Sequence, residues 1–139
     1  MTPGPHPADS MLASVTLDVL DIARAAEFYR LLAGFEVVRR ERQGLIHPEV
    51  HLMSPRYPGF GLVLREMFGV RVAGSRPGGM LRLAFYDPDP ARRVPELTPH
   101  VRWVWEKQAP GPEGYPYLRM TDPDGYEIEL YSERASTAT

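Results

Sequence analysis

Apolar and polar residues alternate in the segment SVTLDV, residues 14–19. This period of two predicts a strand with one apolar and one polar face. The spacing then becomes helical, because apolar residues recur at Ile22, Ala25, Ala26, Tyr29 and Leu32. Asp21 is suited to cap the start of this helix, and Gly34 is suited to end it after about Ala33.

The same kind of pattern predicts three further strands, at 35–41, 49–54 and 60–66. A Gly/Pro-rich segment at 68–79 interrupts the pattern, which then returns. A strand is predicted at 80–86, a short helix within DPDPARRVPELT and a strand at 100–108. The segments YPYLRM and YEIELYS are expected to form a hairpin around the turn DPDG.

The order of these elements amounts to an internal repeat of about 55 to 65 residues, in which each copy reads βαβββ. Neither copy can bury both faces of its sheet alone, so we expect the two to pair around a shared concave surface. The predicted organisation is a loose N-terminus (1–11), a first module (12–67), a linker (68–79), a second module (80–132) and a loose C-terminus (133–139). The fold class is α+β.

Composition excludes several classes of function. Hydrophobic residues make up 43% of the chain, charged residues 24%, and the net charge is -2, so neither nucleic acid nor an acidic membrane is an expected partner. The absence of cysteine excludes disulfides, thiolate metal sites and cysteine nucleophiles. No apolar run reaches the roughly 18 residues of a membrane span, and the N-terminus lacks the features of a secretory signal. We therefore expect a soluble, cytoplasmic protein.

Two segments, VTLDVLDIARAAEFYRLLAGFEVV in the first module and MTDPDGYEIELYS at the end of the second, resemble the vicinal oxygen chelate superfamily. This group includes glyoxalase I, extradiol dioxygenases, fosfomycin-modifying enzymes and bleomycin-binding resistance proteins. The resemblance covers nearly all of residues 12–132. It implies the glyoxalase/bleomycin resistance fold, in which two βαβββ modules form a curved, partly open barrel-like sheet whose interior is the ligand site.

The resemblance also implies where a metal would bind. Metal-using members take ligands from the first and last strands of each module, and these positions correspond here to Ser14, Val63, Arg82 and Glu129. Only Glu129 matches, because serine is a weak donor, valine offers none and arginine is a permanent cation. We therefore expect no metal ion and no other cofactor.

Arg82 and Glu129 suggest a different chemistry at the missing metal position. If both point inward, the guanidinium is expected to pair with the carboxylate and neutralise the pocket floor without an ion. Glu127 is then a carboxylate at the rim. The alternative is that both residues lie on the outer face as solvated charges.

The predicted inward faces supply the candidate ligand-binding residues. Trp103 and Trp105 share one face of their predicted strand, where they either stack on a planar ligand or pack against the helix. Of the four histidines, which are expected to have structural roles, His51 is the one that most merits a test. The candidate ligand-binding residues are Ser14, Thr16, Arg82, Tyr86, Trp103, Trp105, Glu127 and Tyr131.

Three functions remain open at this stage. The resemblance favours a homodimeric, metal-independent protein that binds a small organic molecule, aromatic or amphipathic, as bleomycin-resistance proteins do. The second is a metal-free isomerase, cyclase or hydrolase with Asp18 or Glu129 as acid or base, assisted by Tyr86 or Tyr131. The third is a metal enzyme with an unusual ligand set such as Glu129, His51 and Asp18.

Overall fold

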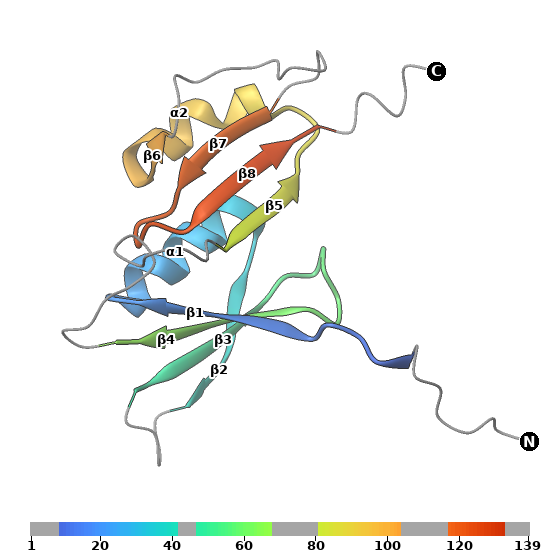
Figure 1. Cartoon of the computed structure of the whole chain (residues 1–139), viewed down its shortest axis with the longest axis vertical. Helices are drawn as coiled ribbons and strands as arrows, with labels where there is room; N and C mark the ends of the chain where they lie inside the picture. Colours follow the sequence, from blue (N-terminus) through green and yellow to red (C-terminus); the bar gives the residue numbers. More distant parts are fainter. Residues whose placement is uncertain (1–8, 42–46, 68–80, 104–116, 133–139) are drawn as a thin grey trace, which may run out of the picture.

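The computed structural model describes residues 9–41, 47–67, 81–103 and 117–132 (Figure 1). The first part of the chain forms β1 (Ser14–Val19), α1 (Ile22–Ala33), β2 (Glu36–Glu41), β3 (Glu49–Met53) and β4 (Gly61–Glu66). The second part forms β5 (Arg82–Tyr86), a 3₁₀ turn (Pro90–Arg93), α2 (Val94–Leu97), a second 3₁₀ turn (Thr98–His100), β6 (Arg102–Trp103), β7 (Tyr117–Thr121) and β8 (Glu127–Tyr131).

The two parts build sheets of the same design. Sheet A has the order β1-β4-β3-β2 and sheet B the order β5-β8-β7-β6. In each sheet the first strand pairs in parallel with the last, β1 with β4 and β5 with β8, and the other neighbours are antiparallel. The predicted fold class, with two related modules and open sheets, is confirmed.

Helix α1 has the predicted bounds for the predicted reasons. The Asp21 side chain accepts a hydrogen bond from the Arg24 amide at 3.1 Å and so caps the first turn. Gly34 ends the helix in the left-handed conformation, with a φ of 74°, and its amide donates to the Arg30 carbonyl. The five buried side chains of the helix are Ile22, Ala25, Phe28, Tyr29 and Leu32.

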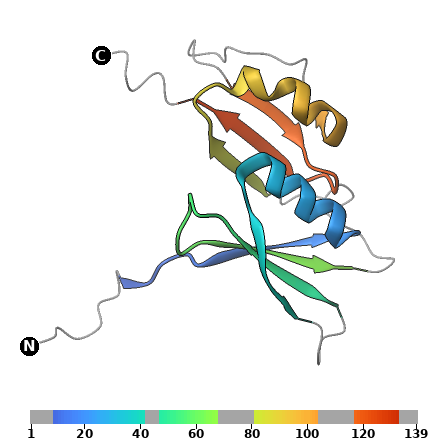
Figure 2. The same cartoon turned by 180° about the vertical axis from the view of Figure 1, so that it is seen from behind.

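One apolar core serves both sheets. Buried residues of sheet A, such as Leu17 and Leu64, belong to the same cluster as Met120 and Ile128 of sheet B. Helix α1 lies between the two sheets in both views (Figure 1, Figure 2). Because the buried residues of each sheet point toward this shared core, the polar residues between them form an open face that points away from it.

The prediction of one strand over 100–108 is wrong at its start. Residues Thr98–His100 instead continue the helical segment as a 3₁₀ turn, and the Thr98 hydroxyl donates to the Val94 carbonyl at 2.6 Å. Strand β6 begins at Arg102, and the remainder of the predicted strand, like the predicted linker, lies outside the described residues. Within the described ranges, the helices are too short and too polar to cross a membrane.

Candidate functional site

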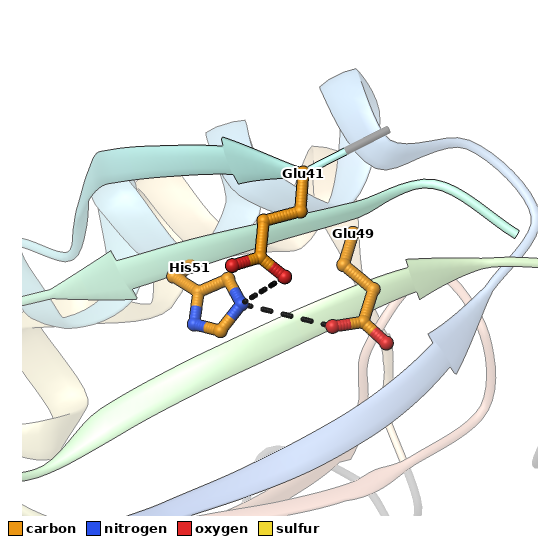
Figure 3. Close-up of side chains that lie close together, drawn as sticks. All are labelled: Glu41, Glu49 and His51. Atoms are coloured by element: carbon orange, nitrogen blue, oxygen red, sulfur yellow. Dashed lines mark ion pairs between the residues drawn. The ribbon is translucent and has the colours of Figure 1, made fainter. Parts of the chain in front are cut away.

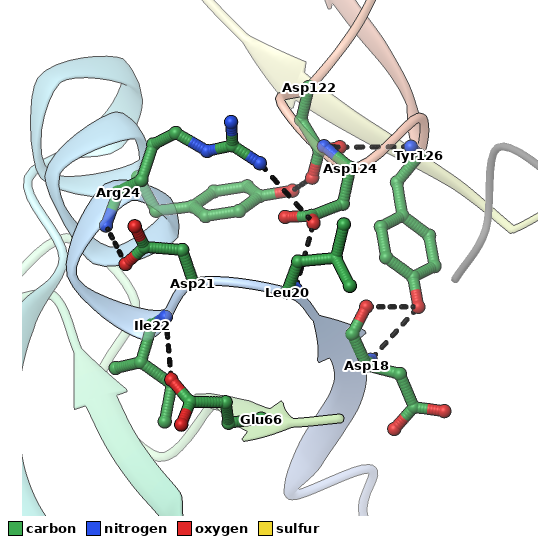
Figure 4. A network of polar contacts seen from close by, with 10 residues as sticks. Asp18, Leu20, Asp21, Ile22, Arg24, Glu66, Asp122, Asp124 and Tyr126 are labelled. Carbon is green, nitrogen blue, oxygen red and sulfur yellow. Dashed lines mark hydrogen bonds and ion pairs between the residues drawn. The ribbon is translucent and has the colours of Figure 1, made fainter. Parts of the chain in front are cut away.

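The hairpin turn of the second module is the joint that holds the modules together (Figure 4). The Asp122 carboxylate accepts hydrogen bonds from the amides of Asp124 and Tyr126, both at 2.9 Å, which fixes the turn. Its other oxygen accepts the hydroxyl of Tyr29 on α1 at 2.5 Å. One side chain therefore ties the β7–β8 turn to the helix of the first module.

The same turn also holds the end of β1. The Asp124 carboxylate accepts the Leu20 amide at 3.0 Å and lies 3.7 Å from the Arg24 guanidinium. The Tyr126 hydroxyl accepts a hydrogen bond from the Asp18 amide at 2.9 Å and donates to the Asp18 carbonyl at 3.0 Å. These contacts use the backbone of Asp18 and leave its carboxylate on the open face.

The buried carboxyl groups of this joint are the ones with raised pKa values. Desolvation by burial raises the pKa of Asp122 from its ordinary value, although its hydrogen bonds from Tyr29, Tyr126 and Asp124 act in the opposite direction. Burial likewise raises the pKa of Asp124. The pKa of Tyr29 lies well above its usual range because the phenol is buried and faces the Asp122 carboxylate. All three perturbed groups are engaged in holding the modules together.

A groove of about 400 Å³ lies on the open face of sheet A. Ser14 and Val63 are in its wall, so two of the positions where the resemblance places metal ligands lie in the groove. Every lining residue belongs to the first module: Ala13, Ser14, Val38, Arg39, His51, Leu52, Met53, Gly59, Gly61 and Val63. Thr16 and Asp18 follow Ser14 on the same face of β1, where the Asp18 carboxylate is held by Arg65 at 2.8 Å.

Charged side chains cover the open face of sheet B, but they pair differently from the prediction. Arg82 donates to Glu127 at 2.7 Å, and Glu129 accepts from Arg119 at 2.7 Å. The predicted Arg82–Glu129 pair is therefore wrong, because the parallel register sets Arg82 opposite Glu127 and Ala84 opposite Glu129. The Glu127 side chain, which was expected at the rim, is only 12% exposed and is engaged by Arg82.

The residues at the four family positions do not fit a divalent metal. Val63 offers no donor atom, and Arg82 brings a cation. The Glu129 carboxylate is already engaged by Arg119. Ser14 and Val63 belong to sheet A, whereas Arg82 and Glu129 belong to sheet B.

The remaining candidate ligand residues have mixed positions. Tyr86 and Tyr131 lie opposite each other on the open face of sheet B, with ring centroids 6.3 Å apart in an edge-to-face arrangement. Trp103 is partly buried and packs against the apolar core. Trp105 lies outside the described residues.

His51 belongs to a cluster that the sequence analysis did not identify (Figure 3). Its Nε2 atom lies 3.8 Å from a Glu41 oxygen and 3.6 Å from a Glu49 oxygen. Arg39 pairs with Glu41 at 3.0 Å, and one of its terminal nitrogens is 3.4 Å from both ring nitrogens of His51. Within one chain the alternative metal set of Glu129, His51 and Asp18 is not formed, because Glu129 belongs to the other sheet and Asp18 pairs with Arg65.

Several contacts with central roles were not predicted from the sequence. The contact of Arg119 with Glu129 could have been predicted, because a hairpin centred on the DPDG turn pairs these two residues. The contact between Tyr29 and Asp122 spans 93 residues and had no signal in the local pattern. Glu41 and Glu49 lie in neighbouring predicted strands, but their pairing depends on a register that shifts between Val37 and Arg39.

Comparison with solved structures gives consistent matches to one fold. Glyoxalase I from Leishmania major is 24% identical, with 92% of this chain and 90% of that chain covered and a TM-score of 0.72. TnmS3, an antibiotic binding protein from Streptomyces sp. CB03234, is also 24% identical, with coverage of 91% and 98% and a TM-score of 0.63. The fosfomycin resistance protein FosX from Listeria monocytogenes, complexed with Mn(II), is 19% identical, with coverage of 88% and 92% and a TM-score of 0.60.

These structures include a protein complexed with Mn(II) and a protein described as antibiotic binding, so their shared feature is the fold. No protein-family model matches the sequence, and the search of curated proteins gives no match. The chain has the glyoxalase/bleomycin resistance fold, which confirms its resemblance to the vicinal oxygen chelate superfamily at the level of the fold.

Proposed function

We propose that the protein binds a small aromatic or amphipathic organic molecule and sequesters it without a metal ion, in the manner of an antibiotic-binding protein. The observation that carries this proposal is the groove on sheet A, which contains Ser14 and Val63 where metal-using members would have ligands. The likeness to the solved structure of TnmS3, which is described as an antibiotic binding protein, supports this proposal.

The size and the lining of the groove support an organic ligand. Its volume of about 400 Å³ falls in the range of roughly 300–1,000 Å³ that is typical of small-molecule sites. Val38, Met53 and Val63 supply apolar surface, while Arg39 and His51 supply polar groups at the wall. An apolar surface with a few polar groups is the arrangement that orients an amphipathic ligand.

We further propose a homodimer in which a second copy completes this site. The groove is lined by the first module alone, and the open face of sheet B points away from the shared core of its own chain. Placing sheet B of a partner over the groove would bring Tyr86 and Tyr131 to the ligand. Aromatic side chains provide large contact areas at low entropic cost.

Binding is favoured over catalysis because the two candidate acid–base residues are already engaged. Asp18 accepts hydrogen bonds from Arg65, and Glu129 accepts one from Arg119. A carboxylate that is held by a guanidinium must lose that contact before it can exchange a proton with a substrate. The buried carboxyl groups with raised pKa values, Asp122 and Asp124, hold the turn.

The proposal can be tested by titration with metal-free bleomycin and a panel of planar aromatic natural products, with the protein and buffers treated with EDTA. Calorimetry should show binding, and mass spectrometry should recover each bound compound unchanged. Gly61→Val is the test variant. A Cβ at Gly61 meets Leu52, Ala13 and Ser14 only at ordinary contact distances of 3.5–3.9 Å, so the chain should fold while the added methyl groups reduce the groove.

Ala23→Val is the control for a new valine side chain, because it adds two of the three carbon atoms that Gly61→Val adds, at an exposed position of α1 that does not line the groove. We expect at least about a tenfold loss of affinity in Gly61→Val, corresponding to about 1.4 kcal/mol, and unchanged affinity in Ala23→Val. Turnover that is abolished by Asp18→Asn or Glu129→Gln would instead establish a metal-free enzyme. Binding that disappears after EDTA treatment would refute metal independence.

A further inference from the structure

The open face of sheet A carries a row of charged residues beside the groove. The cross-strand register aligns Asp18 of β1 with Arg65 of β4, Arg65 with Glu49 of β3, and Glu49 with Glu41 of β2. His51 lies one position further along the same face and lines the groove together with Arg39. This row is distinct from the four positions at which the resemblance places a metal.

We propose that Glu41, Glu49 and His51 bind a transition-metal dication, with Zn²⁺ as the best fit. The set combines two carboxylates with one imidazole, and both donor types are common zinc ligands. The three donor atoms lie within 4.8 Å of one another, and Nε2 of His51 is 3.6 and 3.8 Å from the two carboxylate oxygens (Figure 3). Donors at about 2.1 Å from a tetrahedral zinc ion are about 3.4 Å apart, so small side-chain rotations complete the site.

The charge balance of the row favours a bound cation. Glu41 and Glu49 face each other directly across two antiparallel strands, and like charges in that position destabilise a sheet. Among the described residues of this row, two guanidiniums, of Arg39 and Arg65, accompany the three carboxylates of Asp18, Glu49 and Glu41. Arg65 is moreover engaged with Asp18 at 2.8 Å.

The site is accessible enough to load and leaves room for further ligands. The side chains of His51 and Glu49 are 25% and 24% exposed, and that of Glu41 is 40% exposed. Three protein donors leave at least one coordination position open, as in zinc sites that keep a water molecule. Because His51 lines the groove, that position is accessible from the groove side.

Arg39 already contacts two of the three proposed ligand residues. Its guanidinium pairs with Glu41 at 3.0 Å and approaches His51 at 3.4 Å, so the cation and a dication compete for the same donors. The Arg39 side chain is 60% exposed, which allows it to swing into solvent. Removal of this charge should therefore tighten metal binding, an effect that a purely structural ion-pair cluster does not predict.

The experiment is a Zn²⁺ titration of the EDTA-treated full chain with no organic ligand present. Binding is measured by calorimetry and by NMR of the histidine side chains. We expect one Zn²⁺ per chain and a shift of the His51 ring signals. His51→Ala and Glu49→Gln should each weaken binding at least about 100-fold, since loss of an outer-shell partner alone costs 10–100-fold. Arg39→Gln should tighten binding by about tenfold, the effect of removing one positive charge a few ångströms from a dication in water-like surroundings.

Glu36→Gln is the matched control, because Glu36 is an exposed glutamate of β2 that lies opposite Met53, outside the cluster. Its Zn²⁺ affinity should equal that of the unmodified chain. The absence of binding at millimolar Zn²⁺, or binding that survives His51→Ala, would overturn the proposal. The result is independent of the proposed organic ligand, whose binding is measured after EDTA treatment.

Discussion

Removal of the Asp122 carboxylate should be among the most damaging single changes in the chain. In Asp122→Ala the Tyr29 hydroxyl and the amides of Asp124 and Tyr126 all lose their acceptor in a buried region. Each buried donor without a partner costs about 1–3 kcal/mol. Relief of the desolvated charge offsets part of this loss, which leaves a net destabilisation of about 3 kcal/mol, or a fall in Tm of about 10 °C for a chain of this size.

The assay is urea unfolding at neutral pH, monitored by circular dichroism. The four variants are Asp122→Ala, Tyr29→Phe, the double variant that combines them, and Asp89→Ala. Tyr29→Phe alone should cost about 1 kcal/mol, because Asp122 keeps its two amide donors. In the Asp122→Ala background the same change should be neutral or stabilising, since the hydroxyl then has no acceptor. Asp89→Ala serves as the control, because Asp89 is exposed. Additive losses for Tyr29 and Asp122, or a loss in Asp122→Ala no larger than in Asp89→Ala, would refute this account of the joint.

The pH dependence of the same joint has a definite sign. Burial raises the pKa of Asp122 in the folded chain above its unfolded value, so the folded state binds more protons over the interval between the two values. This contribution to stability is fully present below the unfolded pKa and is lost as the pH rises through the folded pKa. Asp122→Asn removes it, so the stability of the unmodified chain relative to Asp122→Asn should decrease from pH 3 to pH 7. An increase over that interval would contradict the raised pKa.

Two further substitutions test other buried charges. Arg93→Met should destabilise the chain by about 3 kcal/mol, because the guanidinium donates to the Leu31 and Leu32 carbonyls at the end of α1 and to the buried Asp87 carboxylate. The control is Arg92→Met, at an exposed neighbouring position, which should change the urea midpoint little. Equal effects of the two substitutions would contradict this role of Arg93. Arg119→Met should cost about 2 kcal/mol by leaving the largely buried Glu129 carboxylate without its guanidinium. Arg82→Met should cost less than about 1 kcal/mol in the same unfolding assay, because the Arg82 side chain is 47% exposed and Glu127 keeps the Arg119 guanidinium at 3.6 Å. The reverse order would show that the outer ion pair carries the stability.

Local patterns predicted the elements well because each element is determined by nearby residues. The period of two in 14–19, the Asp21 cap and the Gly34 stop all act within a few residues, and β1 and α1 have the predicted bounds. The predicted start of β6 was wrong, although it also depends on nearby residues. The alternating pattern of HVRWVW suggested a strand, whereas Thr98 and Pro99 extend the preceding helical segment through His100.

The candidate site was harder to predict because it depends on register between distant strands. Strands β5 and β8 pair Arg82 with Glu127, so a pair of Arg82 with Glu129 would require a register shifted by two residues. The paired residues Arg82 and Glu127 are 45 positions apart in the chain. A parallel pair has no tight turn to fix its register. The antiparallel pair of β7 and β8 does have such a turn, and the contact of Arg119 with Glu129 follows directly from it.

The two sheets show how one architecture gives two different surfaces. The parallel register pairs Ser14 with Gly61 and Thr16 with Val63 in sheet A, and the equivalent pairs in sheet B are Arg82 with Glu127 and Ala84 with Glu129. Short side chains in sheet A leave the groove open, whereas the long charged side chains of sheet B fill the equivalent face with ion pairs. Ser14, Val63 and Arg82 stand where the resemblance implies metal donors, but only the two replacements in sheet A create space. A ligand that enters the groove therefore meets small and apolar residues beside Arg39 and His51, and in the proposed dimer the charged face of sheet B of the second copy would close over it.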